Sequence, residues 1–257
     1  MSSPVGVAFN PDHTRAAFTL SHAKGNILTG DMVTSLRTAL EGIGQNPHLK
    51  LITIEGAGPD FSFGASIPEH APDQIGRVLP DMHALIYDLL DAPAPTAALV
   101  RGRCFGGGFE LALACDFILA EEDARFALPE IALGVFPPAG SVLLPARVGL
   151  APAASSLMTG ETIMAGEWHR RGLVHVLADP GTLDGAVNTW FARTLAPHSA
   201  AALRHGAAAM RMALQSHVRT MLPEIERLYL DDLMRTHDAV EGVAAFMAKR
   251  QPAWTDE

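Results

Sequence analysis

The stretch Gly102-Arg-Cys-Phe-Gly-Gly-Gly-Phe-Glu-Leu-Ala-Leu-Ala-Cys115 predicts an abrupt passage from strand to helix. A short apolar run from Thr96 to Arg101 leads into it, three glycines follow, and good helix formers come next. This order directs free N–H groups and the positive end of a helix dipole at one point. The glycine spacing differs from that of a dinucleotide-binding loop, and no Lys-Ser/Thr pair follows Gly108 as in a phosphate-binding loop. The remaining use is an oxyanion hole, in which backbone amides polarise a carbonyl group.

A second glycine-rich segment, Gly56-Ala-Gly-Pro-Asp-Phe-Ser-Phe-Gly-Ala-Ser-Ile67, follows a predicted strand from Leu49 to Glu55. Its residues tolerate unusual backbone angles, so its amides are able to point at a ligand. Taken alone, the segment is more typical of a plain surface connection. A functional role requires a second N–H donor, and an oxyanion hole would take one amide from each of the two glycine-rich segments.

Two carboxylates accompany these segments. Glu110 falls in the first helical turn after the glycines, and Glu130 follows Pro129 after a short predicted strand from Arg125 to Leu128. Each alone is also typical of a glutamate that stabilises a helix start. Beside an oxyanion hole, the pair would divide general-base and general-acid work between a water and a carbon. Spacing alone does not establish that they converge, so both interpretations stay open.

The rest of the chain indicates an α/β fold. Predicted strands such as Arg15 to Leu20 alternate with helices such as Met32 to Ile43, which implies right-handed crossovers and a mostly parallel sheet. From about Asp179 onward only helical patterns occur; they cover Ala200 to Gln215, Glu224 to Arg235 and Ala239 to Lys249. We predict an α/β core over residues 1–195 and a helical region over residues 196–257 that packs on the core or on a neighbouring subunit.

The composition excludes several classes of protein. The 257 residues include 19 Lys+Arg and 28 Asp+Glu, a formal net charge of −9, without a basic cluster, so neither nucleic acid nor a membrane is an expected partner. No export signal or membrane span is visible. Cys104 and Cys115 are the two cysteines and form no CxxC motif, which predicts reduced thiols and a cytoplasmic location. The 11 histidines lack the spacing of metal ligands, so no metal is expected.

Several motifs resemble, in order and over nearly the whole chain, the crotonase (enoyl-CoA hydratase/isomerase) superfamily. They are Phe61-Ser-Phe-Gly-Ala-Ser66, Gly106-Gly-Gly-Phe-Glu110, Leu128-Pro-Glu-Ile-Ala-Leu-Gly134, Met158-Thr-Gly160 with Gly172-Leu-Val174, and Glu241-Gly-Val-Ala-Ala-Phe-Met-Ala-Lys-Arg250. The resemblance implies a spiral of ββα units with a helical C-terminal extension and homotrimers that often pair into hexamers. It also implies acyl-CoA thioester substrates, with coenzyme A as part of the substrate and no metal or redox cofactor.

The resemblance also implies roles for individual residues. The amides of Ala65 and Gly107 would form the oxyanion hole, Glu110 would orient and deprotonate a water, and Glu130 would donate a proton to carbon. The positions that match the family's CoA-binding channel or its C-terminal helix near the adenine are Lys24, Asn26, Ile67, Phe246 and Lys249.

Two departures from the family pattern bear on the substrate. The segment Phe136-Pro-Pro-Ala-Gly140 replaces the common Gly-Ala-Gly-Gly, and Ser66 stands where Asp is usual, so Ser66 and Phe136 are predicted to contact the acyl group. With the run from Phe63 to His70 and the segment Thr236-His-Asp238, this pattern looks most like one group in the superfamily, the cyclohexa-1,5-diene-1-carbonyl-CoA hydratases of anaerobic aromatic degradation. That implies 1,4-addition of water to give 6-hydroxycyclohex-1-ene-1-carbonyl-CoA. His70 is either part of this pattern or a surface residue.

Other functions fit less well. A hydratase of short-chain enoyl-CoA is the main alternative, and an enoyl-CoA isomerase or thioester hydrolase would use one glutamate rather than two. A serine hydrolase lacks the Gly-x-Ser-x-Gly motif around Ser66 or Ser141. An RNA-binding member of the superfamily would need a basic, aromatic-rich face, which a net charge of −9 and 6% aromatic residues disfavour.

Overall fold

A computed structural model describes residues 3–22, 25–70 and 74–257. Within these residues the main sheet has six strands, which in spatial order are β1 (Val5–Phe9), β2 (Arg15–Leu20), β3 (Leu51–Gly56), β4 (Thr96–Val100), β6 (Phe117–Glu121) and β9 (Val176–Ala178). β1 pairs antiparallel with β2, and all the other neighbours are parallel. The predicted, mostly parallel sheet is therefore confirmed, although β3 begins two residues later than the apolar pattern indicates.

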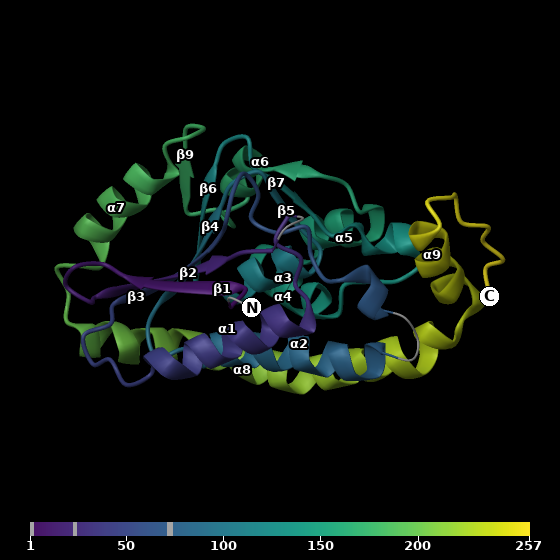
Figure 1. The fold of residues 1–257 in the computed structure, drawn as a ribbon, viewed down its shortest axis with the longest axis horizontal. Coiled ribbons are helices and arrows are strands. Elements are labelled where there is room, and N and C mark those ends of the chain that lie inside the picture. The colour runs from purple at the N-terminus through teal and green to yellow at the C-terminus, as the bar shows by residue number, and fades with distance from the viewer. Residues whose placement is uncertain (1–2, 23–24, 71–73) are drawn as a thin grey trace.

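Nine α-helices accompany the strands in the described part of the chain. They are α1 (Gly30–Ile43), α2 (Ile75–Leu90), α3 (Gly107–Ala114), α4 (Pro138–Val148), α5 (Leu150–Thr159), α6 (Ala165–Arg170), α7 (Leu183–Thr194), α8 (Ala200–Arg227) and α9 (His237–Met247). Figure 1 shows α1, α2 and α8 side by side as one layer beneath the main sheet, with α7 and α9 at opposite ends of the molecule. None of these helices is long and apolar enough to cross a membrane.

Two consecutive ββα units carry the glycine and glutamate motifs. In the first, β4 leads to β5 (Arg103–Phe105) and then α3; in the second, β6 leads to β7 (Arg125–Ala127), the 3₁₀ turn η2 (Pro129–Leu133) and α4. The first strand of each unit joins the main sheet, and the second joins a three-stranded sheet with β8 (Ile163–Met164). The predicted spiral of ββα units is thus confirmed. All eight residues of α3 are buried, which places this helix at the centre of the fold.

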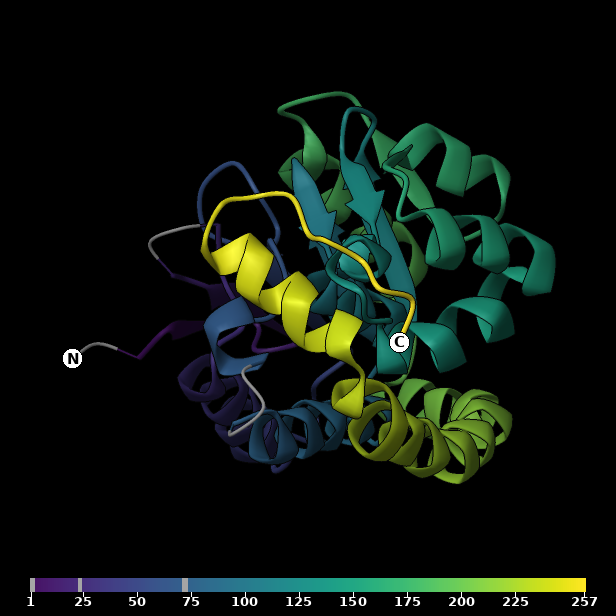
Figure 2. The same ribbon diagram turned by 90° about the vertical axis from the view of Figure 1, so that its right-hand side faces the viewer.

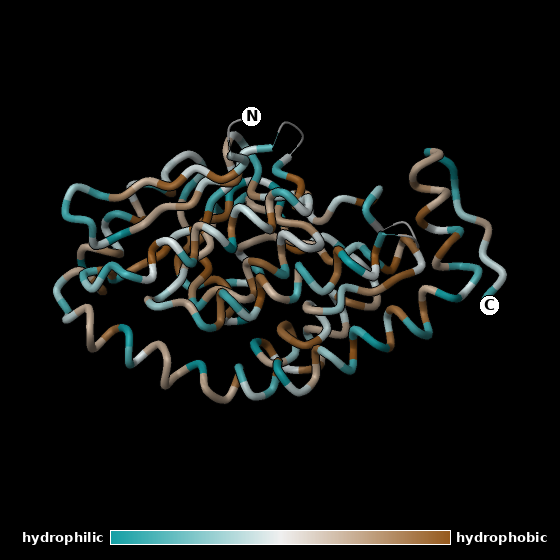
Figure 3. The backbone as a smooth tube through the Cα atoms, turned by 60° about the horizontal axis from the view of Figure 1, so that its bottom comes forward, coloured by the Kyte–Doolittle hydropathy of each residue, from teal (hydrophilic) through white to brown (hydrophobic). Residues whose placement is uncertain are grey.

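The helical C-terminal region packs on the core through α8, which contacts α2 and α4. Arg211 anchors it: its guanidinium is buried, and Nε donates to Asp116 Oδ1 at 2.8 Å. Figure 3 shows hydrophilic and hydrophobic stretches alternating along this helix, as its one-sided burial requires. The boundary between residues 195 and 196 stays a prediction.

The expected separation of a helix ending at Gln215 from one starting at Glu224 is wrong. α8 continues through Pro223 to Arg227, because Val218 and Leu222, one turn apart, are fully buried in the core and hold the helix there. The segment that follows is the π-helical turn η3 (Leu228–Asp232) and then the 3₁₀ turn η4 (Leu233–Arg235).

Helix α9 lies across one end of the sheets (Figure 2). It contacts η2 and the 3₁₀ turn η1 (Ile67–His70). A side chain at Gly242 would overlap the carbonyl oxygen of Leu133, so a glycine is required for this close approach. The C-terminal helix is therefore packed directly on the turn that carries Glu130.

Candidate active site

The two glycine-rich segments meet, and their meeting depends on missing side chains. Gly64 and Gly106 have φ angles of +99° and +50°, a region that favours glycine. A Cβ atom at Gly64 would lie 2.8 Å from the Phe105 carbonyl oxygen, and one at Gly106 would lie 2.7 Å from Glu130 Oε1. Backbone and carboxylate thus approach each other more closely than any other residue type would permit.

The amides of Ala65 and Gly107 lie side by side at this junction. A Cβ atom at Gly107 would be 3.2 Å from the Ala65 nitrogen. Gly107 is the first residue of α3, so its N–H has no partner within the helix. In the described part of the chain neither amide donates to a protein acceptor. Two adjacent free N–H groups at a helix N-terminus have the chemistry of an oxyanion hole.

Glu110 lies beside these amides, on the first turn of α3, and is 6% exposed. Its Oε1 accepts a hydrogen bond of 2.8 Å from the amide of Gly140, near the N-terminus of α4. Burial raises the pKa of Glu110, while hydrogen bonds from the amides of Gly140 and Ala139 and the electrostatic effect of His83 oppose the rise. The Phe-Pro-Pro segment therefore ends in a helix start that holds one of the two carboxylates.

Glu130 faces the same space from η2. Its Oε2 atom is buried and has no hydrogen-bond partner in the part of the chain that the structure describes. Burial, and then the negative charge of Glu110, raise the pKa of Glu130 to about 8. The surroundings thus give the two carboxyl groups different tendencies to ionise. Backbone amides stabilise the ionised form of Glu110, whereas Glu130 favours its protonated form. This is the arrangement that an acid and base pair needs at neutral pH.

Both glutamates and both amides line one cavity, here called the glutamate cavity. Its described lining is otherwise mainly apolar and consists of Leu28, Val33, Ala65, Ile75, Val78, Leu79, Met82, Gly107, Glu110, Glu130, Phe136, Pro137, Pro138 and Tyr229. A neighbouring cavity shares Ala65 and Glu130 with it and extends toward Ile67 and toward Val243 of α9. An apolar cavity with a few converging polar groups is the usual form of a small-molecule site.

Comparison with known proteins places this geometry in a family. The model of the enoyl-CoA hydratase/isomerase family matches residues 15–257. The chain belongs to this family. It is 42% identical to the cyclohexa-1,5-dienecarbonyl-CoA hydratase of Thauera aromatica over 98% of this chain and 97% of that protein, and 34% identical to the 2,3-dehydroadipyl-CoA hydratase of Escherichia coli over 90% of each. An enoyl-CoA hydratase from Mycobacterium avium subsp. paratuberculosis superposes with a TM-score of 0.86 at 29% identity, covering 98% of this chain and 99% of that one.

Membership of the enoyl-CoA hydratase/isomerase family confirms the expected enzyme class, a hydro-lyase. The structure brings together four of the predicted site residues, Ala65, Gly107, Glu110 and Glu130, and adds Phe136 to the wall of the glutamate cavity. Their roles in the reaction stay predictions.

The remaining residues predicted to bind the substrate, through its coenzyme A or its acyl group, are placed less uniformly. Ile67 lines the neighbouring cavity. Asn26 is buried, and its side-chain amide donates to the carbonyls of Ala57, Asp60 and Phe61, so it shapes the first glycine-rich loop from behind. Ser66 donates its backbone amide to Leu28 and is not in the described lining of either cavity.

The C-terminal candidates lie on the surface. Phe246 is 51% exposed on α9, and Lys249 follows that helix as an exposed residue with a φ of +52°. Lys24 and the side chain of His70 lie outside the described residues. A contact between these positions and the substrate therefore stays a prediction.

Three residues near the site were missed by the sequence analysis. Tyr229, in η3, lines the glutamate cavity. Buried His83, on α2, contacts Glu226 of α8 through Nδ1 at 2.5 Å. Glu226 and Tyr229 interrupt an apolar pattern in the C-terminal region, but that pattern alone does not indicate a cavity formed by residues far away in the sequence.

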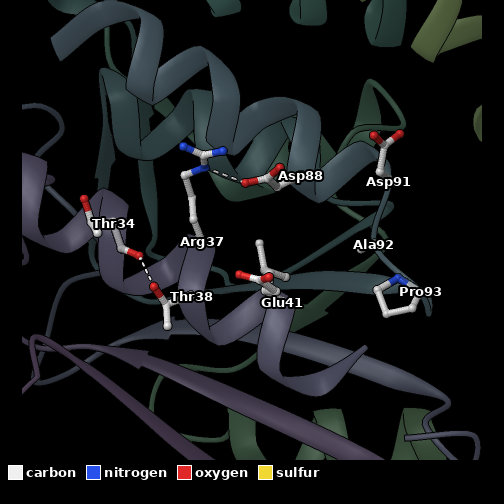
Figure 4. Close-up of a pocket in the computed structure, with 9 residues that line it drawn as sticks. Thr34, Arg37, Thr38, Glu41, Asp88, Asp91, Ala92 and Pro93 are labelled. Carbon is white, nitrogen blue, oxygen red and sulfur yellow. Dashed lines mark hydrogen bonds and ion pairs between the residues drawn. The ribbon is translucent and has the colours of Figure 1, made fainter. Parts of the chain in front are cut away.

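A surface groove between α1 and α2 offers a contrast (Figure 4). It is lined by polar and charged residues that include Arg37, Glu41 and Asp88. Arg37 is already paired with Asp88 at 2.6 Å, and Asp91 at the same groove pairs with Arg219. Because Arg37, Asp88 and Asp91 are already held in these ion pairs, the chemistry points to the glutamate cavity instead.

Proposed function

We propose that this member of the enoyl-CoA hydratase/isomerase family adds water to cyclohexa-1,5-diene-1-carbonyl-CoA and forms 6-hydroxycyclohex-1-ene-1-carbonyl-CoA. The observation that carries the proposal is the convergence in one apolar cavity of two free amides and two glutamates, Glu110 held by backbone amides and Glu130 with a buried oxygen that has no partner among the described residues. The similarity to the Thauera aromatica hydratase supports the choice of substrate. The reaction would belong to the anaerobic degradation of aromatic acids.

In the proposed reaction the thioester oxygen accepts hydrogen bonds from the amides of Ala65 and Gly107, which stabilise the negative charge that develops there. Glu110 takes a proton from water as the oxygen attacks the carbon β to the carbonyl. Glu130 donates its proton to the far end of the conjugated diene. One carbon–carbon double bond remains, conjugated to the thioester, and the atoms of one water are added.

The chemistry uses no electron transfer, so we propose that no redox cofactor or metal takes part and that coenzyme A enters only with the substrate. Flat Phe136 and the two prolines after it, which line the cavity, would form the wall against a ring. We propose that the protein is cytoplasmic and assembles as a homotrimer or hexamer. Light scattering on the purified protein would measure the molar mass of the assembly.

The test compares two substrates. We expect kcat/KM for the cyclic dienoyl thioester to exceed that for crotonyl-CoA by more than the roughly 10–200-fold that a methylene-sized difference in a pocket provides. Equal or better turnover of crotonyl-CoA would instead indicate a short-chain enoyl-CoA hydratase.

A further inference from the structure

One hydroxyl group in the glutamate cavity has no part in the reaction described above. Tyr229 is 1% exposed, and its ring packs edge-on against Phe136 with 5.3 Å between the ring centroids. Within the described residues its hydroxyl has no hydrogen-bond partner in the protein. Because Tyr229 lines the cavity, a hydroxyl without a protein partner is available there to a ligand or a water.

Tyr229 reaches the cavity because the helix changes its winding there. The π-helical turn η3 follows directly on α8, and such turns often occur at functional sites. Leu228, the preceding residue, is 51% exposed, while Tyr229 is buried against the cavity. Among the described lining residues, Tyr229 is the only side chain other than the two glutamates with a hydrogen-bonding oxygen or nitrogen.

The proposed 1,4-addition creates a need for such a group. Water attacks the carbon β to the carbonyl, whereas the proton enters the far end of the diene, on the opposite side of the ring. When the two events occur at adjacent carbons, one pair of carboxyl groups is able to hold the water and also protonate the neighbouring carbon. Across a ring, the acid must face away from the water, so a further group has to orient it.

We propose that the hydroxyl of Tyr229 orients the reacting water, with Oη accepting one hydrogen of the water while Glu110 accepts the other; this rests on the proposed function. As the water oxygen bonds to the β carbon, its proton passes to Glu110, and Glu130 gives its own proton to the far carbon. Glu110 ends protonated and Glu130 ionised, and transfer of one proton between them through solvent restores the starting state.

The surroundings keep this tyrosine neutral. Burial, and then the charges of Glu130 and Glu110, raise the pKa of Tyr229 above its usual range. The other ionisable groups nearby are His83 of α2, which acts electrostatically on Glu110, and Glu226 of α8, which contacts His83 Nδ1 at 2.5 Å. A neutral phenol is able to accept a hydrogen bond from water without adding a negative charge beside that of Glu110.

The test is Tyr229→Phe, which keeps the ring against Phe136 and removes only the hydroxyl. The chain contains one other tyrosine, Tyr87, which packs beside Arg219 outside the described lining of the cavity, so Tyr87→Phe is a matched control. We expect Tyr229→Phe to lower kcat for the cyclic dienoyl thioester about 10- to 100-fold and to change crotonyl-CoA hydration less than about threefold. Its Tm should not fall, since the hydroxyl has no protein partner.

Each other result overturns the inference in a recognisable way. If Tyr229→Phe hydrates the cyclic thioester at the wild-type rate, the hydroxyl does not orient the water. If both substrates slow equally, its role is not specific to 1,4-addition. If the wild-type enzyme itself fails to hydrate the cyclic thioester, the proposed function is wrong, and the inference falls with it.

Discussion

The two glycine-rich turns and the C-terminal arm formed by α8 and η3 reach the same cavity by different physical means. The turns bring backbone amides together, and the close approach at Gly64 and Gly106 leaves no room for a side chain. The arm contributes side chains, Glu226 toward His83 and Tyr229 toward the cavity, from a helix held by distant packing. The turns therefore need glycine at fixed positions, whereas the position of the arm depends on packing with residues far away in the sequence.

This difference separates two kinds of function within one site. The turns provide the means to polarise a thioester, which every acyl-CoA substrate needs. The arm lies against the wall that contains Phe136, where the chain departs from the common family pattern. Substitutions in the turns and their glutamates should therefore affect every substrate, and those in the arm should change selectivity and pH dependence.

The largest effects are expected at the glutamates. Glu110→Gln and Glu130→Gln should each lower kcat for hydration by about 10²–10⁴-fold, because a base or an acid is lost, while the Kd for the CoA thioester changes little. Single-turnover kinetics and equilibrium binding measure the two quantities separately. A variant that kept near wild-type turnover at saturating substrate would remove that glutamate from the reaction.

A smaller but general loss is expected at the oxyanion hole. In Gly107→Ala the new Cβ atom would lie 3.2 Å from the Ala65 nitrogen and crowd the space beside that amide, so kcat/KM for all thioesters should fall about 10²-fold. The matched control is Gly76→Ala on α2, where a Cβ atom meets nothing within 4 Å. A folded Gly107→Ala enzyme with normal turnover would exclude this turn from the site.

His83, the α2 residue that Glu226 of the arm contacts, should act through pH. The electrostatic effect of His83 lowers the pKa of Glu110, so His83→Gln should raise that pKa and shift the acid limb of the kcat/KM profile to higher pH. The plateau rate should change much less. Profiles measured with a cyclic and a linear thioester should shift alike, because Glu110 is the base for both. An unshifted acid limb would show that His83 does not act on Glu110.

The smallest effect concerns stability. Because burial raises the pKa of Glu130, the folded protein holds this proton more tightly than the unfolded chain, and unfolding releases it between the ordinary pKa of 4.5 and about pH 8. The free energy of unfolding therefore falls as pH rises through that window. Glu130→Gln should melt a few degrees above wild type near pH 8 and equally near pH 4. Glu122→Gln, at an exposed position, is the control. If Glu130→Gln and the wild type melted at the same temperature at both pH values, the protonated state of the Glu130 carboxyl group would be contradicted.

The sequence predicted the site only where chemistry and local structure coincide. The glycine turns, Glu110 and Glu130 were identifiable because few other residues permit those backbone angles or supply that chemistry, and the alternation of strands and helices indicated the ββα spiral. The helix through Pro223 was missed, since buried Val218 and Leu222 outweigh the local signal of a proline. Tyr229 was missed because a π-helical turn and long-range packing decide where its side chain points.

The most direct test of the account is the position of the new carbon–hydrogen bond. The wild-type enzyme would hydrate cyclohexa-1,5-diene-1-carbonyl-CoA in D₂O, and NMR would locate the deuterium in the product. We expect deuterium on the ring carbon at the far end of the original diene, with the hydroxyl on the carbon β to the thioester. Deuterium on the carbon α to the thioester, or no hydration of the ring at all, would contradict it.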